Sequence, residues 1–193
     1  MEELKVRKVI TYEYVTLDGV MEAPEKWQFP YFSDDFEEFI RSQILSFDAS
    51  LLGRVTYEIF ASYWPLQTNN EFGLADKINS APKFVISSSL KKVEWNNSTL
   101  IKNRKHFAEE INKLKQQAGG DIGIIGSATL VQSLMQADLI DEVRLLVHPV
   151  VVGSGKRLFK DGTDLKKLKL IDTKTFDSGF LLLRYQPDRG AKA

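Results

Sequence analysis

Strand-like and helix-like patterns of apolar residues alternate along most of this chain. Runs rich in Val, Ile, Leu and aromatic residues, bounded by Gly, Pro, Asn or Asp, indicate strands, whereas apolar residues three and four apart indicate helices. The patterns predict strands at 6–17, 48–53, 83–89, 98–102, 122–125, 142–153, 167–176 and 180–186. They predict helices that begin after Ser33, at 54–64, around 107–114 and from Leu130.

The order of these segments predicts an α/β fold. Strands alternate with helices up to about Gln136, and the remainder is mostly β. Such alternation favours a mixed, mostly parallel sheet that is covered by helices on both faces. Asp177, Ser178 and Gly179 separate the last two strands, which is typical of a hairpin, so we expect an antiparallel C-terminal edge.

Composition limits the classes of protein to which the chain can belong. Its 193 residues suit one domain, 1–193, with a core of about 6–186. Lys+Arg and Asp+Glu are both 26, so there is no net positive charge of the kind that nucleic-acid binding usually needs. No apolar run is long enough to span a membrane, and the N-terminal residues lack a signal-peptide pattern. We therefore expect a cytoplasmic protein without membrane or nucleic-acid partners.

The sequence contains no pattern that indicates a metal site or a hydrolase triad. The chain has no cysteine, which excludes disulfides, thiolate ligands and a Cys nucleophile. His106 and His148 have no partner at metal-ligand spacing, so we expect each to be structural or merely exposed. No Gly-x-Ser-x-Gly elbow is present either.

One strand-to-helix junction suggests a phosphate site. The apolar run 122–125 stops at Gly126 and Ser127, and a helical pattern follows almost at once. A helix N-terminus presents unpaired N–H groups and a partial positive charge, and glycine lets a phosphate approach the backbone closely. Ser127 and Thr129 could add hydroxyl donors. An ordinary tight turn with Ser127 as N-cap is the alternative.

Two further strand ends carry groups that suit an anion. Gly53 ends the strand at 48–53, and Arg54 and Thr56 follow it; a cation at a helix start is unfavourable unless an anion is nearby. An exposed Arg54 beside an acidic side chain is the alternative. Ser87, Ser88 and Ser89 end a third strand, with Lys91 and Lys92 just after.

Standard nucleotide motifs are absent. No Gly-x-Gly-x-x-Gly follows the first strand. The segment Gly153-Ser154-Gly155-Lys156 is similar to part of a P-loop, but Val150 stands where the first glycine belongs and Arg157 replaces Ser/Thr. Neither a Rossmann nor a P-loop site is therefore predicted.

The order of short motifs resembles a known superfamily. "VTLDGVME", "LLGRVTYE", "KFVISSS", "IIGSATLVQ", "HPVVVGSGKRLF" and the closing hairpin together look like the dihydrofolate reductase-like superfamily. Within it the chain is most similar to the C-terminal reductase domain of riboflavin-biosynthesis (RibD) enzymes, over about 6–186. The resemblance implies a mixed sheet with flanking helices, NADPH as cofactor, and a reductase acting on a small molecule.

The resemblance also implies roles for individual residues. Those expected to bind the cofactor phosphates are Gly53, Arg54 and Thr56, with Arg54 near the adenosine 2′-phosphate. Those expected along the adenosine are Ser87, Ser88 and Ser89. Those expected to cradle the pyrophosphate are Gly126, Ser127, Ala128, Thr129 and Leu130. Those expected beside the nicotinamide are Val15 and Thr16, and those expected at the substrate are Asp18, Gly19, Gly153 and Gly155.

Two departures from the family pattern matter. The family commonly has Gly-Gly at the pyrophosphate turn, where this chain has Gly126 and Ser127. The Ser127 side chain could crowd the phosphate or bind it. The zinc deaminase that accompanies the riboflavin reductase needs cysteine ligands, which this chain lacks, so the substrate need not be the same.

Three hypotheses for the function remain open. The first is an NADPH-dependent reductase of a riboflavin-precursor-like, pyrimidine or pteridine substrate, similar to 5-amino-6-(5-phosphoribosylamino)uracil reductase. The second is dihydrofolate reductase proper, for which Asp34, Asp35, Glu37 and Glu38 are candidate carboxylates by position only. The third is a non-catalytic nucleotide-binding dimer. Asp18 is the preferred catalytic group, although Asp-Gly is also ordinary turn chemistry.

A homodimer is expected from the C-terminal strands. The segments 143–153 and 180–185 carry more apolar residues than one buried face of a sheet requires. Helices that cover both faces would be the alternative explanation. If the dimer forms, the interface is expected to include outward-facing positions among Val143, Leu145 and Val147.

Overall fold

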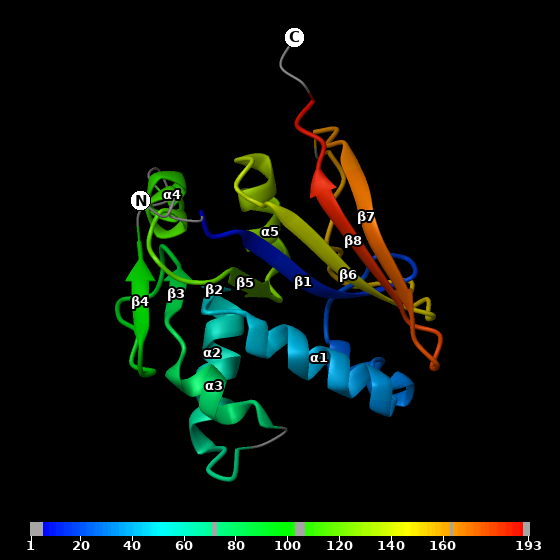
Figure 1. The fold of residues 1–193 in the computed structure, drawn as a ribbon, viewed down its shortest axis with the longest axis horizontal. Coiled ribbons are helices and arrows are strands. Elements are labelled where there is room, and N and C mark those ends of the chain that lie inside the picture. The colour runs from blue at the N-terminus through cyan, green and yellow to red at the C-terminus, as the bar shows by residue number, and fades with distance from the viewer. Residues whose placement is uncertain (1–5, 71–72, 103–106, 163, 191–193) are drawn as a thin grey trace.

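An eight-stranded sheet is the centre of the fold, in the order β4-β3-β2-β5-β1-β6-β8-β7 (Figure 1). The computed structural model of the protein describes residues 6–70, 73–102, 107–162 and 164–190. The strands are β1 (Val9–Thr16), β2 (Ala49–Gly53), β3 (Lys83–Ile86), β4 (Ser98–Ile101), β5 (Ile122–Ile125), β6 (Glu142–His148), β7 (Leu168–Thr175) and β8 (Leu181–Pro187). Only the β6–β8 and β8–β7 pairs are antiparallel among these strands, which confirms the predicted fold class.

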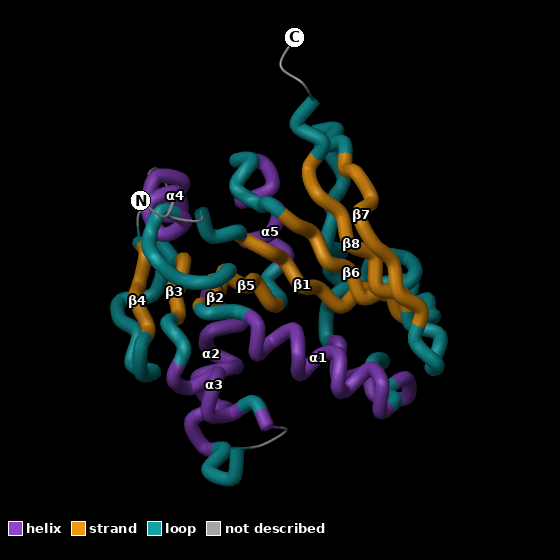
Figure 2. The backbone as a smooth tube through the Cα atoms, in the orientation of Figure 1, coloured by secondary structure: helices purple, strands orange, loops and turns teal. Residues whose placement is uncertain are grey.

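Helices cover the sheet from both sides (Figures 1 and 2). The helices are α1 (Asp34–Ser46), α2 (Arg54–Tyr63), α3 (Ala75–Ser80), α4 (Phe107–Lys115) and α5 (Ala128–Gln136). The first three lie on one face of the sheet, and α4 and α5 lie on the other. Each element that the apolar pattern predicted is present, whereas α3 was not predicted, because its six residues are too few to show a helical period.

Alternating side chains of β1 contribute to two hydrophobic clusters on opposite faces of the sheet. Val9 and Val15 face α4 and α5, where they pack with residues of α5 such as Leu134. Ile10 and Tyr12 point to the opposite face and pack with Phe36 and other residues of and around α1. This two-residue alternation is the normal pattern of a strand that is buried on both faces.

The parallel strands bring their carboxyl ends to one edge of the sheet. β1 is flanked by β5 and β6, with Tyr12 opposite Ile125 and Thr16 opposite His148. β2 pairs with β5 on one side and with β3 on the other, all in parallel. The segments that follow β1, β2, β3, β5 and β6 therefore meet at this edge, where ligands bind in open α/β sheets.

Two strands, β3 and β6, end several residues earlier than predicted, and local chemistry explains both. β3 ends at Ile86 because the Ser87 hydroxyl accepts hydrogen bonds from the N–H groups of Ser89 (3.2 Å) and Leu90 (3.1 Å), which forms a turn. β6 ends at His148 because Pro149 follows and has no N–H to continue the ladder.

Ser33 occupies the predicted N-cap position of α1, but its side chain does not cap the backbone. The Ser33 hydroxyl instead donates to Asp35 Oδ1 at 2.5 Å. The acidic residues of this first turn are exposed or half-buried, so they favour the helix mainly through its dipole.

Candidate active site

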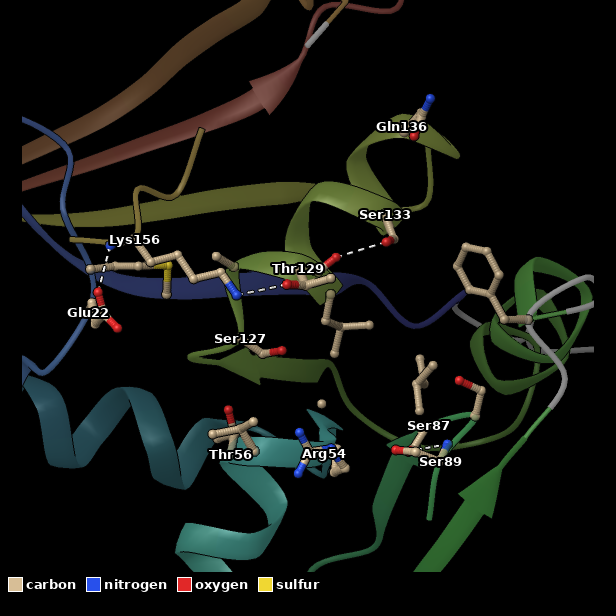
Figure 3. Close-up of a pocket in the computed structure, with 18 of the residues that line it drawn as sticks. Glu22, Arg54, Thr56, Ser87, Ser89, Ser127, Thr129, Ser133, Gln136 and Lys156 are labelled. Atoms are coloured by element: carbon tan, nitrogen blue, oxygen red, sulfur yellow. Dashed lines mark hydrogen bonds between the residues drawn. The ribbon is translucent and has the colours of Figure 1, made fainter. Parts of the chain in front are cut away.

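A groove of about 980 Å³ runs along the carboxyl edge of the sheet (Figure 3). It is bounded by the β2–α2 junction, the turn after β3, the first turn of α5 and the loops after β1 and β6. The predicted site residues that line it are Gly53, Arg54, Thr56, Ser87, Ser88, Ser89, Ser127, Ala128, Thr129 and Leu130. The three strand ends with anion-binding chemistry therefore share one groove.

The turn before α5 has an unusual backbone. Gly126 and Ser127 both adopt left-handed conformations, with φ of 69° and 73°. Glycine tolerates this geometry, but a serine there is strained, and such strain is found most often at functional positions. Ser127 is the N-cap of α5, as predicted, yet its side chain makes no capping hydrogen bond. The start of α5 thus has no side-chain cap, and Ala128 and Thr129 of its first turn line the groove.

Ser127 and Gly53 fit each other across the groove. A Cβ atom built on Gly53 would lie 2.2 Å from Ser127 Oγ, which is closer than two non-bonded heavy atoms can approach. Gly53 is itself the N-cap of α2, so the Ser127 hydroxyl lies at the start of a second helix. Thr56 lies on the first turn of that helix, 3.3 Å from where a Cβ on Gly126 would be. The N-termini of α2 and α5 therefore face the same space.

Arg54 already has a partner in its own helix. Its Nη1 donates to Glu58 Oε2 at 2.8 Å, one helical turn along α2, and both side chains are nearly half exposed. This is the arrangement that the sequence analysis gave as the alternative to a phosphate contact, an exposed arginine beside an acidic side chain. A role for Arg54 at a 2′-phosphate stays a prediction, and any such role requires competition with Glu58.

Asp18 is occupied by structural hydrogen bonds. Its carboxylate accepts hydrogen bonds from the Thr16 hydroxyl (2.6 Å) and the N–H groups of Gly153 (2.9 Å) and Val152 (3.3 Å). The Thr16 hydroxyl, and then the two backbone groups, lower the pKa of Asp18 below its ordinary value. Asp18 is therefore ionised at neutral pH and ties two loops together. Its predicted catalytic role stays a prediction, and the geometry does not suit it to hold a proton.

The other predicted nicotinamide and substrate residues lie just outside the lining of the groove. Val15 and Thr16 are buried in β1. Gly19, Gly153 and Gly155 have positive φ angles of 80°, 81° and 127°, in the two loops that Asp18 connects. The structure thus brings these residues to the same edge as the groove, and their contacts with cofactor or substrate stay predictions.

Lys156 is a groove residue that the sequence motifs did not identify. Its Nζ donates to Thr129 Oγ1 at 2.8 Å, on the first turn of α5 (Figure 3). Its backbone N–H donates to Glu22 Oε2 at 2.8 Å. Its only signal in the sequence was the segment Gly153-Ser154-Gly155-Lys156, which does not match a P-loop. Lys156 lines the groove because the loop after β6 passes beside the first turn of α5.

The chain is similar in sequence to a known family of domains. A family model described as the RibD C-terminal domain matches residues 7–182. The chain belongs to the RibD C-terminal domain family. This confirms the resemblance drawn from the sequence motifs. An uncharacterized protein of Bacillus subtilis (strain 168), YyaP, is 34% identical to this chain, over 94% of the chain and 96% of YyaP.

Solved structures of the same fold include reductases. A pyrimidine reductase-like protein from Corynebacterium diphtheriae matches with a TM-score of 0.67 and 13% identity, over 96% of this chain and 94% of that protein. Dihydrofolate reductase from Enterococcus faecalis, solved with NADP(H), matches with a TM-score of 0.62 and 13% identity, over 94% and 96%. At these identities the likeness shows the fold, which is dihydrofolate reductase-like.

In this RibD C-terminal domain a buried carboxyl group lies under the α5 turn. Glu13 is on β1, is 1% exposed, and accepts a hydrogen bond from the Thr11 hydroxyl at 2.7 Å. Burial raises the pKa of Glu13 to about 8, while hydrogen bonds from Thr11 and from the backbone of Gly126 partly oppose the rise. Glu13 is therefore mostly neutral at pH 7. The sequence signal was a single acid inside an apolar strand, which the motif analysis passed over.

The one histidine among the described residues lies in a cluster of aromatic rings. His148 is fully buried between aromatic rings, including those of Trp27 and Phe180, and burial lowers its pKa to about 4. His106 lies outside the described residues. Within the described ranges no group of three His, Cys, Asp or Glu side chains could hold a metal ion, and no helix is long and apolar enough to cross a membrane.

Proposed function

We propose that this protein is an NADPH-dependent reductase that transfers hydride to a small heterocyclic substrate of the riboflavin-precursor, pyrimidine or pteridine type. The observation that carries the proposal is the groove in which the N-termini of α2 and α5 face the same space. Membership of the RibD C-terminal domain family and the reductases among structures of the same fold support it.

The residues of the groove fit a dinucleotide. Its volume, about 980 Å³, is at the upper end of the range for small-molecule sites. Gly53 and Gly126 add no side chain of their own at the two helix starts, where the hydroxyls of Ser127 and Thr56 lie, so backbone N–H groups and these hydroxyls can bind phosphate oxygens. Ser87 to Ser89 would lie along the adenosine at one end, and the loops after β1 and β6 would enclose the nicotinamide at the other.

The chain's own part in such a reaction is binding and orientation. Bound NADPH would supply the hydride, and the protein would hold the nicotinamide against the substrate. The hydrogen bonds between Asp18 and the loop after β6 would fix the wall of the substrate pocket.

Dihydrofolate reductase proper is less well supported. The first-turn acids of α1 were its candidate pterin-binding carboxylates, and none of them is buried: Asp34, Glu37 and Glu38 are exposed, and Asp35 is half-buried. The hydrogen bond from the Ser33 hydroxyl is the main cause of the lowered pKa of Asp35. The same hydrogen bond holds the Asp35 carboxylate against the first turn of α1. No observation favours this second activity over the first.

A titration followed by a substrate screen tests the proposal. NADPH fluorescence should show saturable binding to the wild-type protein, with weaker binding of NADH. NADPH oxidation is expected with riboflavin-pathway pyrimidine intermediates, and not with dihydrofolate or simple carbonyl compounds. Binding without turnover on any of these substrates would favour the non-catalytic alternative, and turnover of dihydrofolate alone would favour dihydrofolate reductase.

We also propose that the protein is a homodimer. On the face of the sheet that α4 and α5 cover, those helices lie over the part from β4 to β1 rather than over the β7–β8 hairpin (Figure 1). On that side the hairpin exposes Leu170 (49%) and Leu181 (40%), next to half-buried Leu145 and Val147. Val143 is fully buried, so it is not among the outward-facing positions.

Replacing Leu181 with glutamate is expected to split the dimer, because a charge buried at an apolar interface is costly unless it is paired. Light scattering should give twice the chain mass of 22.0 kDa for the wild type and the mass of one chain for the variant. Leu165→Glu is the control, since Leu165 is 87% exposed in the preceding loop. A wild-type protein of 22.0 kDa at micromolar concentration contradicts the proposal.

A further inference from the structure

The loop that carries Lys156 is fixed against the loop after β1. Backbone hydrogen bonds join Leu17 N–H to Val150 C=O (2.8 Å), Met21 N–H to Lys156 C=O (2.9 Å), and Leu158 N–H to Gly19 C=O (3.1 Å). The Glu22 carboxylate and the Asp18 carboxylate add side-chain contacts to the same loop. Both backbone groups of Lys156 are therefore held, and the start of its side chain is fixed in direction.

The ammonium group of Lys156 can donate further hydrogen bonds. An ammonium carries three N–H donors, and one of them is used by Thr129 Oγ1. Among the described residues no carboxylate lies within 4.0 Å of this Nζ, in contrast to Arg54, which is paired with Glu58. The groove thus contains one cation that its own helix neutralises and another that no described acid neutralises.

The position of this charge is unfavourable without an anion. Lys156 Nζ contacts the first turn of α5, where the helix dipole is positive, so the two repel each other. The fixed loop prevents the whole segment from moving away. An anion placed between the lysine and the turn would reverse the sign of the interaction.

We propose that Lys156 binds an oxygen of the dinucleotide pyrophosphate over the first turn of α5. The inference rests on the proposed function, because it takes the groove to be the cofactor site. In this proposal a residue of the loop after β6 neutralises the pyrophosphate. Arg54 would then contact the 2′-phosphate or no phosphate at all. A phosphate on the substrate is the other source of the same chemistry, which the choice of dinucleotides distinguishes.

The test compares two dinucleotides that share a pyrophosphate and differ in the 2′-phosphate. Dissociation constants for NADPH and NADH would be measured at low salt on wild type, Lys156→Met, Lys156→Arg and Arg54→Met. Lys156→Met should weaken both dinucleotides by the same factor, about tenfold, because a charge-assisted contact to phosphate is lost at an exposed site. Lys156→Arg should restore most of the affinity. Arg54→Met should weaken NADPH alone if Arg54 does contact the 2′-phosphate.

Controls separate the inference from a general loss of charge and from the proposed function. Lys169→Met removes an exposed lysine from β7, far from the groove, and should leave both dissociation constants unchanged. Unchanged affinity of Lys156→Met for both dinucleotides overturns the inference and points to a substrate phosphate. A loss confined to NADPH also overturns it. Failure of the wild type to bind either dinucleotide overturns the proposed function, and the inference with it.

Discussion

Gly126→Val is expected to abolish NADPH binding while the protein stays folded. Gly126 has φ +69°, a left-handed conformation that is strained for a β-branched residue. Relief of this strain would turn the N–H groups at the start of α5 away from the groove, and the new side chain would also press on Thr56, whose Oγ1 lies 3.3 Å from the Cβ position. Loss of two or more phosphate contacts corresponds to a hundredfold or greater weakening, by order of magnitude.

Gly162→Val is a matched control for the strain itself. Gly162 has a similar φ of +75°, but a Cβ there meets nothing within 4 Å, and it lies outside the groove. Both variants should lose a comparable stability, about 1–3 kcal/mol in urea unfolding. Only Gly126→Val should lose NADPH fluorescence enhancement. Wild-type affinity in a folded Gly126→Val protein means that the α5 turn does not bind the cofactor.

Glu13→Gln is expected to change the pH dependence of stability by a large amount. The pKa of Glu13 is raised from 4.5 to about 8, so between these values the unfolded chain ionises and the folded protein does not. The unfolded state then binds fewer protons than the folded state, and the free energy of unfolding falls as the pH rises. Glutamine keeps the shape of the neutral carboxyl group and has no proton to lose. From pH 5 to pH 7 the variant should therefore gain roughly 2.5 kcal/mol relative to wild type.

Urea unfolding of both proteins at pH 5, 6 and 7 measures this gain. The comparison is independent of His148, whose lowered pKa affects both proteins equally by reducing stability as the pH falls from 6.5 towards 4. Glu25→Gln removes a carboxyl group from an exposed turn and controls for the change in net charge. A constant difference between Glu13→Gln and wild type over this range would show that Glu13 is ionised in the folded protein.

The sequence predicts the groove well where local signals coincide with topology. Gly53, Thr56, Ser87 and Ser127 each lie at or just after the end of a predicted strand, and the carboxyl ends of parallel strands meet at one edge of a sheet. The residues of this set come together without any knowledge of side-chain contacts. The fold follows from the same reasoning, since the period of the apolar residues separates strands from helices.

The sequence does not predict which charges the groove leaves free. Arg54 is paired by Glu58, four residues along α2, and this i, i+4 pairing was visible in principle but not decisive. Lys156 reaches the groove because the loop after β6 is bound to the loop after β1, more than a hundred residues earlier in the chain. Asp18 is used for the same connection. Such long-range hydrogen bonds leave no periodic pattern in the sequence.

The central position of β1 determines the order in which this protein can be assembled during synthesis. β1 precedes the other seven strands of the sheet along the chain, yet its two neighbours are β5 and β6. The hydrogen bond from Val9 N–H to Asp141 spans 132 residues, so the contacts of β1 cannot be completed until the residues of β6 have been made. Until then the apolar side chains of β1 stay exposed to solvent. We expect this to slow folding and to make the nascent chain prone to aggregation and to chaperone binding.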